Sequence, residues 1–338
     1  MTVGKKILLA HGGGGRLTNE FINEIILPAF DNKTLSGLTD SAEIKLDSQN
    51  ICFTTDSYVI KPLFFNGGDI GKLAICGTLN DLAVSGARPV AISLALIIEE
   101  GLEIEILRKI LNSAAQTAKQ QNVSIVCGDT KVVEAGSVDK IFINTSGIGT
   151  KLPRAKLGFD EIKTGDFIIV SGTIGDHGMT IMSQREGIKF ESSLKSDCAS
   201  VSELCVKLIE TLGENIKFMR DPTRGGLAAT LNEIADKTDC SIEIYEEKIP
   251  VNLTVKAAAE MLGFDILEIA NEGKFIAIVS ADKAEQCIKL CQTSPIGKDA
   301  AIIGQIAEKD QPLVELITAI EGRRIVQMPY GRELPRIC

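Results

Sequence analysis

The chain has 338 residues, 44% of them hydrophobic and 24% charged, with a net charge of −9 at pH 7. This length is typical of two globular domains. The acidic balance, the 4% aromatic content and the lack of tryptophan argue against a nucleic-acid-binding surface. The best apolar run, residues 90–98, is far too short to span a membrane, so no membrane partner is predicted.

The cysteines indicate the redox compartment, and the histidines bear on whether a zinc site is present. Nine cysteines are present, and none form a C-x-x-C pair. An odd number without a disulfide framework favours a reducing compartment, and the protein is predicted to be cytoplasmic. His11 and His177 are the only histidines, which makes a zinc site of histidine and cysteine improbable.

Near the N-terminus, His11 is followed by four consecutive glycines and Arg16. Such a run leaves the backbone N–H groups open to an anion. It lacks the spacing of a Walker A loop or a dinucleotide-binding fingerprint. A flexible linker and a lid over phosphates are equally compatible with it.

Carboxylates follow two segments of strand character. Residues 50–55 are predicted to be a strand ending at Asp56, and residues 123–127 a strand running into Gly128, Asp129, Thr130 and Lys131. Groups at strand ends commonly bind ligands in α/β proteins. Lys131 there could bind a phosphate or transfer protons, or it could be a solvated lysine at a turn.

A helix is predicted from residue 70 to about residue 86, with Asp69 as its N-cap. Asp81 falls on the small and apolar stripe of this helix. A buried, unpaired carboxylate is costly, so Asp81 should have a cation. A structural salt bridge and Mg²⁺ are the two alternatives.

The second half of the chain contains two further candidates. Asp221 and Thr223 stand just before a predicted helix, where they are either caps or part of an anion site. Glu272 lies in a turn between Asn271 and Gly273, and by default such a carboxylate is solvated. A hard, oxygen-preferring cation such as Mg²⁺, arriving with a nucleotide, fits the predicted acidic cluster of Asp40, Asp56, Asp81, Asp129 and Asp221.

The last residues, Pro335 to Cys338, predict an extended arm ending in a thiol. Terminal arms are mobile unless they are held down. An arm tipped with a thiol could carry a covalently attached group between sites, although a frayed end with an accidental cysteine is the simpler interpretation.

Several motifs occur together in a fixed order: HGGGGR, TTDS, PLFFNGGDIG, GDTK, GDHG, DPTRGG, NEG and the terminal PRIC. In this combination the chain resembles the HypE family of hydrogenase maturation proteins, within the superfamily of aminoimidazole-ribonucleotide synthetase and selenophosphate synthetase. The resemblance covers essentially the whole chain.

The resemblance implies a two-domain PurM-like fold of the α+β or α/β class. It divides the chain into a glycine-rich segment (1–36), an N-terminal ATP-binding and dimerisation domain (37–153), a C-terminal α/β domain (154–307) and a flexible tail (308–338). It also implies a homodimer that binds ATP and Mg²⁺, a HypF carbamoyltransferase as partner, and a HypC–HypD complex as cyano acceptor.

The activity implied is ATP-dependent dehydration of a carbamoyl group on the terminal cysteine to a thiocyanate, the source of the cyanide ligands of [NiFe]-hydrogenase iron. Cys338 would carry the group, and Asp40, Asp81 and Asp221 would bind Mg²⁺. Nucleotide and metal would also be held by Asp56, Asn80, Asp129 and Thr130. Lys131 and Glu272 would handle the proton, and the sequence does not decide which of them is the base.

Three alternatives remain. A selenophosphate synthetase should carry a cysteine or selenocysteine followed by lysine in the glycine loop, which has neither here. An aminoimidazole-ribonucleotide synthetase needs no terminal thiol. A non-enzymatic thiol carrier or scaffold would use Cys338 alone, and the acidic motifs would then be surplus.

Overall fold

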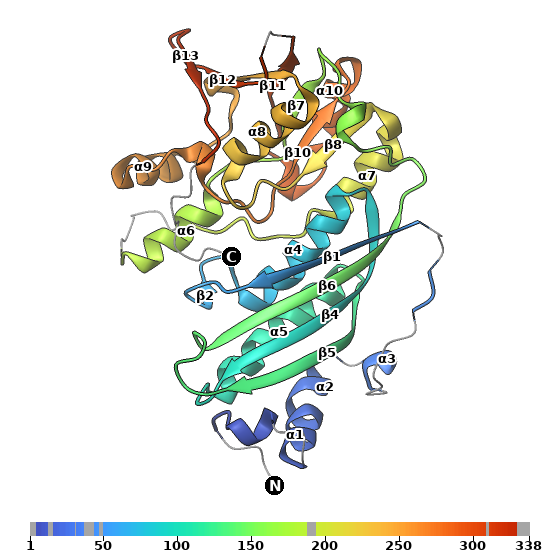
Figure 1. The fold of residues 1–338 in the computed structure, drawn as a ribbon, viewed down its shortest axis with the longest axis vertical. Helices are drawn as coiled ribbons and strands as arrows, with labels where there is room; N and C mark the ends of the chain where they lie inside the picture. The colour runs from blue at the N-terminus through green and yellow to red at the C-terminus, as the bar shows by residue number, and fades with distance from the viewer. Residues whose placement is uncertain are drawn as a thin grey trace.

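The computed structural model describes residues 5–12, 16–30, 32–36, 44–46, 50–187, 194–308 and 311–329. They form two mixed α/β domains stacked along the long axis of the molecule (Figure 1). Asp40 and Cys338, both predicted as site residues, lie outside the described residues. No helix of the described ranges combines the length and apolar character needed to cross a membrane.

The N-terminal domain is built on a four-stranded sheet in the order β1-β6-β4-β5. Its strands are β1 (Ile51–Tyr58), β4 (Ala87–Glu99), β5 (Ser124–Val133) and β6 (Ile141–Lys151). Two helices, α4 (Ile70–Val84) and α5 (Ile104–Gln120), cover one face of this sheet (Figure 1). Their apolar stripes and the inward side chains of the strands make a single core.

Short elements flank this sheet. A hairpin of β2 (Phe64–Phe65) and β3 (Gly68–Asp69) leads into α4. Asp69 caps that helix as predicted, because its Oδ1 accepts hydrogen bonds from the N–H groups of Gly71 and Lys72. At the N-terminus lie a 3₁₀ turn (Leu9–Gly12), α1 (Arg16–Phe21), a π-helical turn (Ile22–Ile26), α2 (Leu27–Phe30) and α3 (Lys33–Ser36).

The C-terminal domain has a seven-stranded sheet in the order β13-β12-β9-β11-β7-β10-β8. Only the β12–β9 pair is parallel. The strands are β7 (Phe167–Val170), β8 (Ile216–Arg220), β9 (Ser241–Tyr245), β10 (Ile276–Val279), β11 (Ala301–Ala307), β12 (Val314–Ile317) and β13 (Arg323–Ile325). Two of them, β12 and β13, lie within the segment assigned to the tail.

Helices cover both faces of this second sheet. One face packs against α7 (Ser202–Leu212) and α10 (Ala284–Cys291), and the other packs against α8 (Gly226–Thr238). The alternation along β10 shows this directly, because Ala277 and Val279 belong to the first cluster and Ile276 and Ile278 to the second. A small separate core joins α6 (Asp176–Arg185) to α9 (Leu253–Leu262).

Residues 194–201 lead into α7 and contact the N-terminal domain. The backbone N–H of Ser196 donates to the carbonyl oxygen of Asn66 at 2.9 Å. Cys198 is buried in the core of the N-terminal domain. This crossing segment therefore attaches the C-terminal domain to the loop before α4 and to α4 itself.

Two local predictions were wrong. The segment from Gly128 to Lys131 is not a loop, because β5 continues through it and pairs with β4 as far as Val133. Likewise, Asp56 does not follow β1 but lies inside it, paired with Thr145 of β6. Both polar segments are strands because the neighbouring strands offer them a continuous ladder of hydrogen bonds.

Candidate active site

A cavity of about 650 Å³ opens between the two domains. Four acidic residues line it: Asp56 from β1, Asp81 from α4, Asp221 after β8, and Glu272 before β10. They come from positions spread over more than 200 residues of sequence and from both domains. The fold thus brings together four of the ten residues proposed from sequence.

The N-terminal pair of carboxylates is oriented by the sheet. Thr54 and Asp56 are two residues apart on β1, so their side chains point to the same face, toward α4. Thr54 Oγ1 donates a hydrogen bond of 2.8 Å to Asp81 Oδ2. This contact fixes one carboxylate oxygen of Asp81 and leaves the rest of the group facing the cavity.

The acidic residues disfavour one another's ionisation. Burial raises the pKa of Asp81, and the negative charge of Asp56 adds to the effect. Burial and the charge of Asp81 raise the pKa of Asp221 to about 7. The pKa of Glu272 lies well above its usual value, mainly because of burial and then because of Asp221. A bound cation would relieve this repulsion, so the cluster is suited to binding one.

The donor set fits a hard divalent cation only in part. Within the described ranges, no three histidine, cysteine or acidic side chains converge closely enough to hold a metal ion. Asp81 and Asp221 are the members of the predicted trio that fall in those ranges, and Asp40 is the third. Their oxygens are the ligand type that Mg²⁺ prefers.

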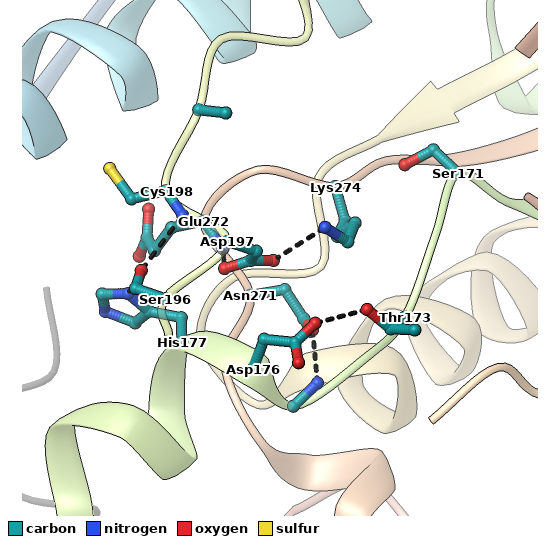
Figure 2. A network of polar contacts seen from close by, with 12 residues as sticks. Ser171, Thr173, Asp176, His177, Ser196, Asp197, Cys198, Asn271, Glu272 and Lys274 are labelled. Atoms are coloured by element: carbon teal, nitrogen blue, oxygen red, sulfur yellow. Dashed lines mark hydrogen bonds and ion pairs between the residues drawn. The ribbon is translucent and has the colours of Figure 1, made fainter. Parts of the chain in front are cut away.

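Glu272 is the most deeply buried of the four, with 3% of its surface exposed. Among the described residues, none hydrogen-bonds to its Oε1. In Figure 2, its side chain lies between Cys198 and Ser196 of the crossing segment, while Asp197 turns away toward Lys274. The default interpretation of a solvated turn carboxylate was wrong, because the crossing segment covers this turn.

The loop that carries Glu272 is anchored on its N-terminal side by Asn271. The Asn271 Oδ1 accepts a hydrogen bond from the N–H of Gly175 at 2.8 Å (Figure 2). Its Nδ2 donates to the carbonyl oxygen of Pro222 at 2.9 Å. Because Pro222 directly follows Asp221, this contact ties the Glu272 loop to the neighbouring carboxylate.

Asn80, which the resemblance assigns to the motifs that hold nucleotide and metal, is buried in the structure. It is 1% exposed and is not among the residues that line the cavity. Its amide bonds to the backbone of residues 199, 201 and 272. The side chain therefore bonds the backbone next to Glu272 and does not face the cavity.

The Asp129–Lys131 segment lies elsewhere in the chain. β5 and β1 are separated by two strands, so Asp129 and Asp56 are about 14 Å apart across the sheet. The register also puts Asp129 and Lys131 on the open face, opposite to α4 and Asp81. Lys131 Nζ lies 3.4 Å from Asp129 Oδ1, and both side chains are exposed. Within one chain, these residues do not reach the interdomain cavity.

Thr130 points to the other face of β5. It borders a separate cavity of about 280 Å³ between β4, β5 and the N-terminal helices. The lining of that cavity is mostly apolar, with Ile22, Ile26 and Leu96 among its residues. Like Asp129, Thr130 therefore lies on β5, the edge strand farthest from Asp56 on β1.

The sequence analysis did not single out the basic and aromatic residues that line the interdomain cavity. Lys151, Arg220 and Arg224 line the interdomain cavity, and Arg224 lies 3.8 Å from Asp56 Oδ1. At its other end, Phe159 and Phe218 are in contact, with ring centroids 4.7 Å apart. Arg220 directly precedes the DPTRGG stretch and Arg224 lies within it, so two arginines close to Asp221 were the available signal.

Comparison with known proteins places this geometry in a family. Residues 38–150 match the N-terminal domain, and residues 163–316 the C-terminal domain, of AIR synthase related proteins. Carbamoyl dehydratase HypE of Escherichia coli K12 is 44% identical over 98% of this chain and 99% of its own length.

Solved structures agree over nearly the same extent. A crystal structure of hydrogenase maturation protein HypE in complex with ATP superposes with a TM-score of 0.94 at 42% identity, covering 98% of this chain and 99% of that one. The HypE component of a HypE–HypF complex gives a TM-score of 0.81 at 49% identity, covering 91% of this chain and 99% of that one. The chain belongs to the HypE family of hydrogenase maturation proteins, within the AIR synthase related fold.

Proposed function

We propose that this protein is an ATP-dependent carbamoyl dehydratase whose substrate is the carbamoyl group on its own Cys338. The observation that carries the proposal is the interdomain cavity, in which three aspartates and the buried carboxyl group of Glu272 face one space. The relatives of the chain include proteins named carbamoyl dehydratase, and one solved relative holds ATP.

The acidic side of the cavity is assigned to metal and phosphates. Mg²⁺ would be held by Asp81 and Asp221, with Asp40 as a further ligand and Asp56 close by. Bound there, the ion neutralises charge on the phosphate being transferred. The positively charged side chains of Arg220 and Arg224 would bind the phosphate oxygens, as arginine commonly does.

The last described part of the tail supports Cys338 as the substrate carrier. Pro329, the last described residue, borders Gly225, since a Cβ placed on Gly225 would lie 3.7 Å from Pro329 Cγ. The preceding residues Thr223 and Arg224 line the cavity. Nine residues remain after Pro329, and an extended chain of that length spans about 30 Å. This anchoring of the chain beside the cavity supports the proposal that Cys338 enters it.

The chemistry requires an activated oxygen and a base. An amide oxygen is a poor leaving group, so its attack on the γ-phosphate of ATP, with loss of one N–H proton, forms an O-phosphate ester with a C=NH group and releases ADP. Removal of the remaining N–H proton then expels phosphate and leaves S–C≡N. Glu272 is the proposed base, because a carboxylate whose conjugate acid has a raised pKa accepts protons more readily. Burial also excludes water, which would otherwise hydrolyse the ester.

A homodimer is proposed to supply the remaining residues. The open face of the N-terminal sheet exposes Ile51, Phe53 and Ile97, and Phe53 is 70% exposed. Ile51 and Phe53 lie together on β1 and Ile97 lies farther along the same face on β4; exposed apolar side chains on a sheet face are typical of an interface. We assign dimerisation to the domain at 37–153, so that Asp129 and Lys131, which lie on this open face, serve the nucleotide site of the neighbouring subunit. Lys131 would there stabilise negative charge on the transferring group.

The remaining partners follow from the same proposal. A HypF carbamoyltransferase would load Cys338, in line with the solved HypE–HypF complex of a relative. A HypC–HypD complex would receive the cyano group. All eight described cysteines are free thiols, which suits a reducing compartment such as the cytoplasm.

Phosphate release tests the proposal. The purified protein, loaded by a HypF-type carbamoyltransferase, should release phosphate from MgATP in an amount that matches the carbamoyl groups loaded. The Cys338→Ala variant should release none above background, whereas a control variant, Cys240→Ala, should behave as wild type. Equal, loading-independent phosphate release by all three proteins would contradict the assignment.

A further inference from the structure

The direction of the Glu272 side chain is not fixed by a hydrogen bond to Oε1. This atom is buried and has no hydrogen-bond partner among the described residues. The direction of the side chain must therefore be set by the backbone on which it stands and by packing. The backbone contacts of Glu272 identify the residues that determine this direction.

Asn80 makes the first of these contacts. Its Nδ2 donates to the carbonyl oxygen of Glu272 at 3.1 Å and to that of Ala199 at 3.1 Å. Its Oδ1 accepts from the N–H of Val201 at 2.8 Å. Both amide hydrogens and the amide oxygen are thus used by the protein itself. Little hydrogen-bonding capacity remains for a nucleotide or a metal.

Asp197 makes the second contact from the opposite side. Its Oδ1 accepts from the N–H of Glu272 at 3.2 Å, and its Oδ2 lies 3.6 Å from Lys274 Nζ (Figure 2). The next residue, Gly273, has no side chain where a Cβ would lie 1.9 Å from the carbonyl oxygen of Asp197. The crossing segment is therefore pressed against the Glu272 loop.

We infer that Asn80 and Asp197 are positioning residues that aim Glu272 at the reacting group, and that Asn80 does not bind the nucleotide. Asn80 bonds the Glu272 carbonyl, and Asp197 bonds its N–H. Because Asn80 is next to Asp81 on α4, the same helix places a cavity carboxylate and the base. This inference rests on the proposed function, since it presumes that Glu272 acts as the base.

A positioning role and a nucleotide-binding role for Asn80 would change different measured quantities. A positioning residue affects the chemical step, because a misplacement of about 1 Å can slow a reaction about 100-fold. A nucleotide-binding residue affects the affinity for ATP. Loss of Asn80 should therefore lower the rate at saturating MgATP and leave the dissociation constant of ATP nearly unchanged.

The experiment compares Asn80→Ala with Asn232→Ala. Asn232 is a matched control, since its Nδ2 also bridges two backbone carbonyl oxygens, at 2.9 and 3.0 Å, but on α8 and away from Glu272. Single-turnover dehydration of the carbamoylated full-length protein is followed by mass spectrometry, and ATP binding by calorimetry. We expect Asn80→Ala to be about 100-fold slower with an ATP affinity within about twofold of wild type. We expect Asn232→Ala to match wild type in both.

A second pair of variants keeps the test independent of the folding of Asn80→Ala. Asp197→Ala removes the acceptor of the Glu272 N–H and should slow dehydration, whereas Asp197→Asn retains an oxygen and should recover most of the rate. The inference is overturned if Asn80→Ala binds ATP more weakly yet reacts at the wild-type rate at saturation, or if Asp197→Ala reacts as fast as wild type. A wild-type protein that binds ATP but never dehydrates would overturn the proposed function, and this inference with it.

Discussion

The side-chain amide of Asn80 donates a hydrogen bond to the backbone carbonyl oxygen of Glu272, at 3.1 Å and across 192 positions of sequence. The contact joins a helix of the N-terminal domain to a loop of the C-terminal domain. Since Asp81 follows Asn80, the two domains place their carboxylates around the cavity as one unit. The relative position of the domains is therefore part of the site.

Replacement of Glu272 should slow the proton-transfer step and spare nucleotide binding. Glu272→Gln keeps the shape of the side chain but removes its basicity, and general-base catalysis typically contributes about 10²- to 10⁴-fold to rate. We expect single-turnover dehydration of the loaded protein to slow by that range while ATP still binds. The exposed Glu260→Gln serves as the control. Dehydration by Glu272→Gln at the wild-type rate would remove Glu272 as the base.

Asp221 should make the cation-free protein less stable as the pH rises. Its pKa is about 7 when folded, against a usual value of 3.8, so the folded protein binds this proton more tightly. The stabilising contribution is complete below pH 3.8 and is lost as the pH rises through about 7. At about 1.4 kcal/mol per pKa unit, it is worth on the order of 4 kcal/mol.

The measurement is chemical denaturation of wild type and Asp221→Asn without divalent cations, at several pH values. Wild type should lose more stability between about pH 4 and pH 8 than Asp221→Asn. Added MgCl₂ should then raise the Tm of wild type at about pH 8 and leave that of Asp221→Asn nearly unchanged. Parallel pH profiles for the two proteins would show that burial and the neighbouring carboxylates do not raise the pKa of Asp221.

Gly77 should not tolerate a side chain. A Cβ at this position of α4 would lie 2.2 Å from the hydroxyl oxygen of Tyr58, which is 1% exposed. Overpacking of this kind typically costs about 1–3 kcal/mol. We expect Gly77→Ala to lower the free energy of unfolding by that amount. Gly77→Ala combined with Tyr58→Phe should regain part of the loss, whereas a single Gly77→Ala with wild-type stability would contradict the packing.

Lys131 and Glu272 should complement each other across subunits. If Lys131 acts on the neighbouring subunit, Lys131→Ala and Glu272→Gln homodimers are each impaired at both sites. A heterodimer of the two, isolated with separate affinity tags, regains one site with both side chains intact. We expect about half of the wild-type activity per dimer in that species. No recovery in the isolated heterodimer would place both residues in the same subunit.

The regular elements around the cavity were predictable because their signals are local. Asp69 caps α4, as predicted, with hydrogen bonds from the N–H groups of residues two and three positions on. The convergence of Asp56, Asp81 and Asp221 could also be expected, since each accompanies a predicted element boundary or a buried stripe.

The errors came from non-local constraints. Gly128 looked like the start of a turn, but a Cβ there would lie 2.2 Å from the carbonyl oxygen of Leu94, so the glycine permits a close approach of β4 and β5. Continuation of the strand then sent Asp129 to the face opposite Asp81. The environment of Asn80 was equally hidden, because its partners lie more than 100 residues away.

Intact-mass spectrometry of the whole protein tests the central claim most directly. After loading by a HypF-type carbamoyltransferase, wild type should gain one carbamoyl group on Cys338, and MgATP should then remove the mass of one water from that adduct. Cys338→Ala should show neither change, and wild type with ATP omitted only the first. An adduct that keeps its mass in MgATP, or both changes in Cys338→Ala, would contradict the account.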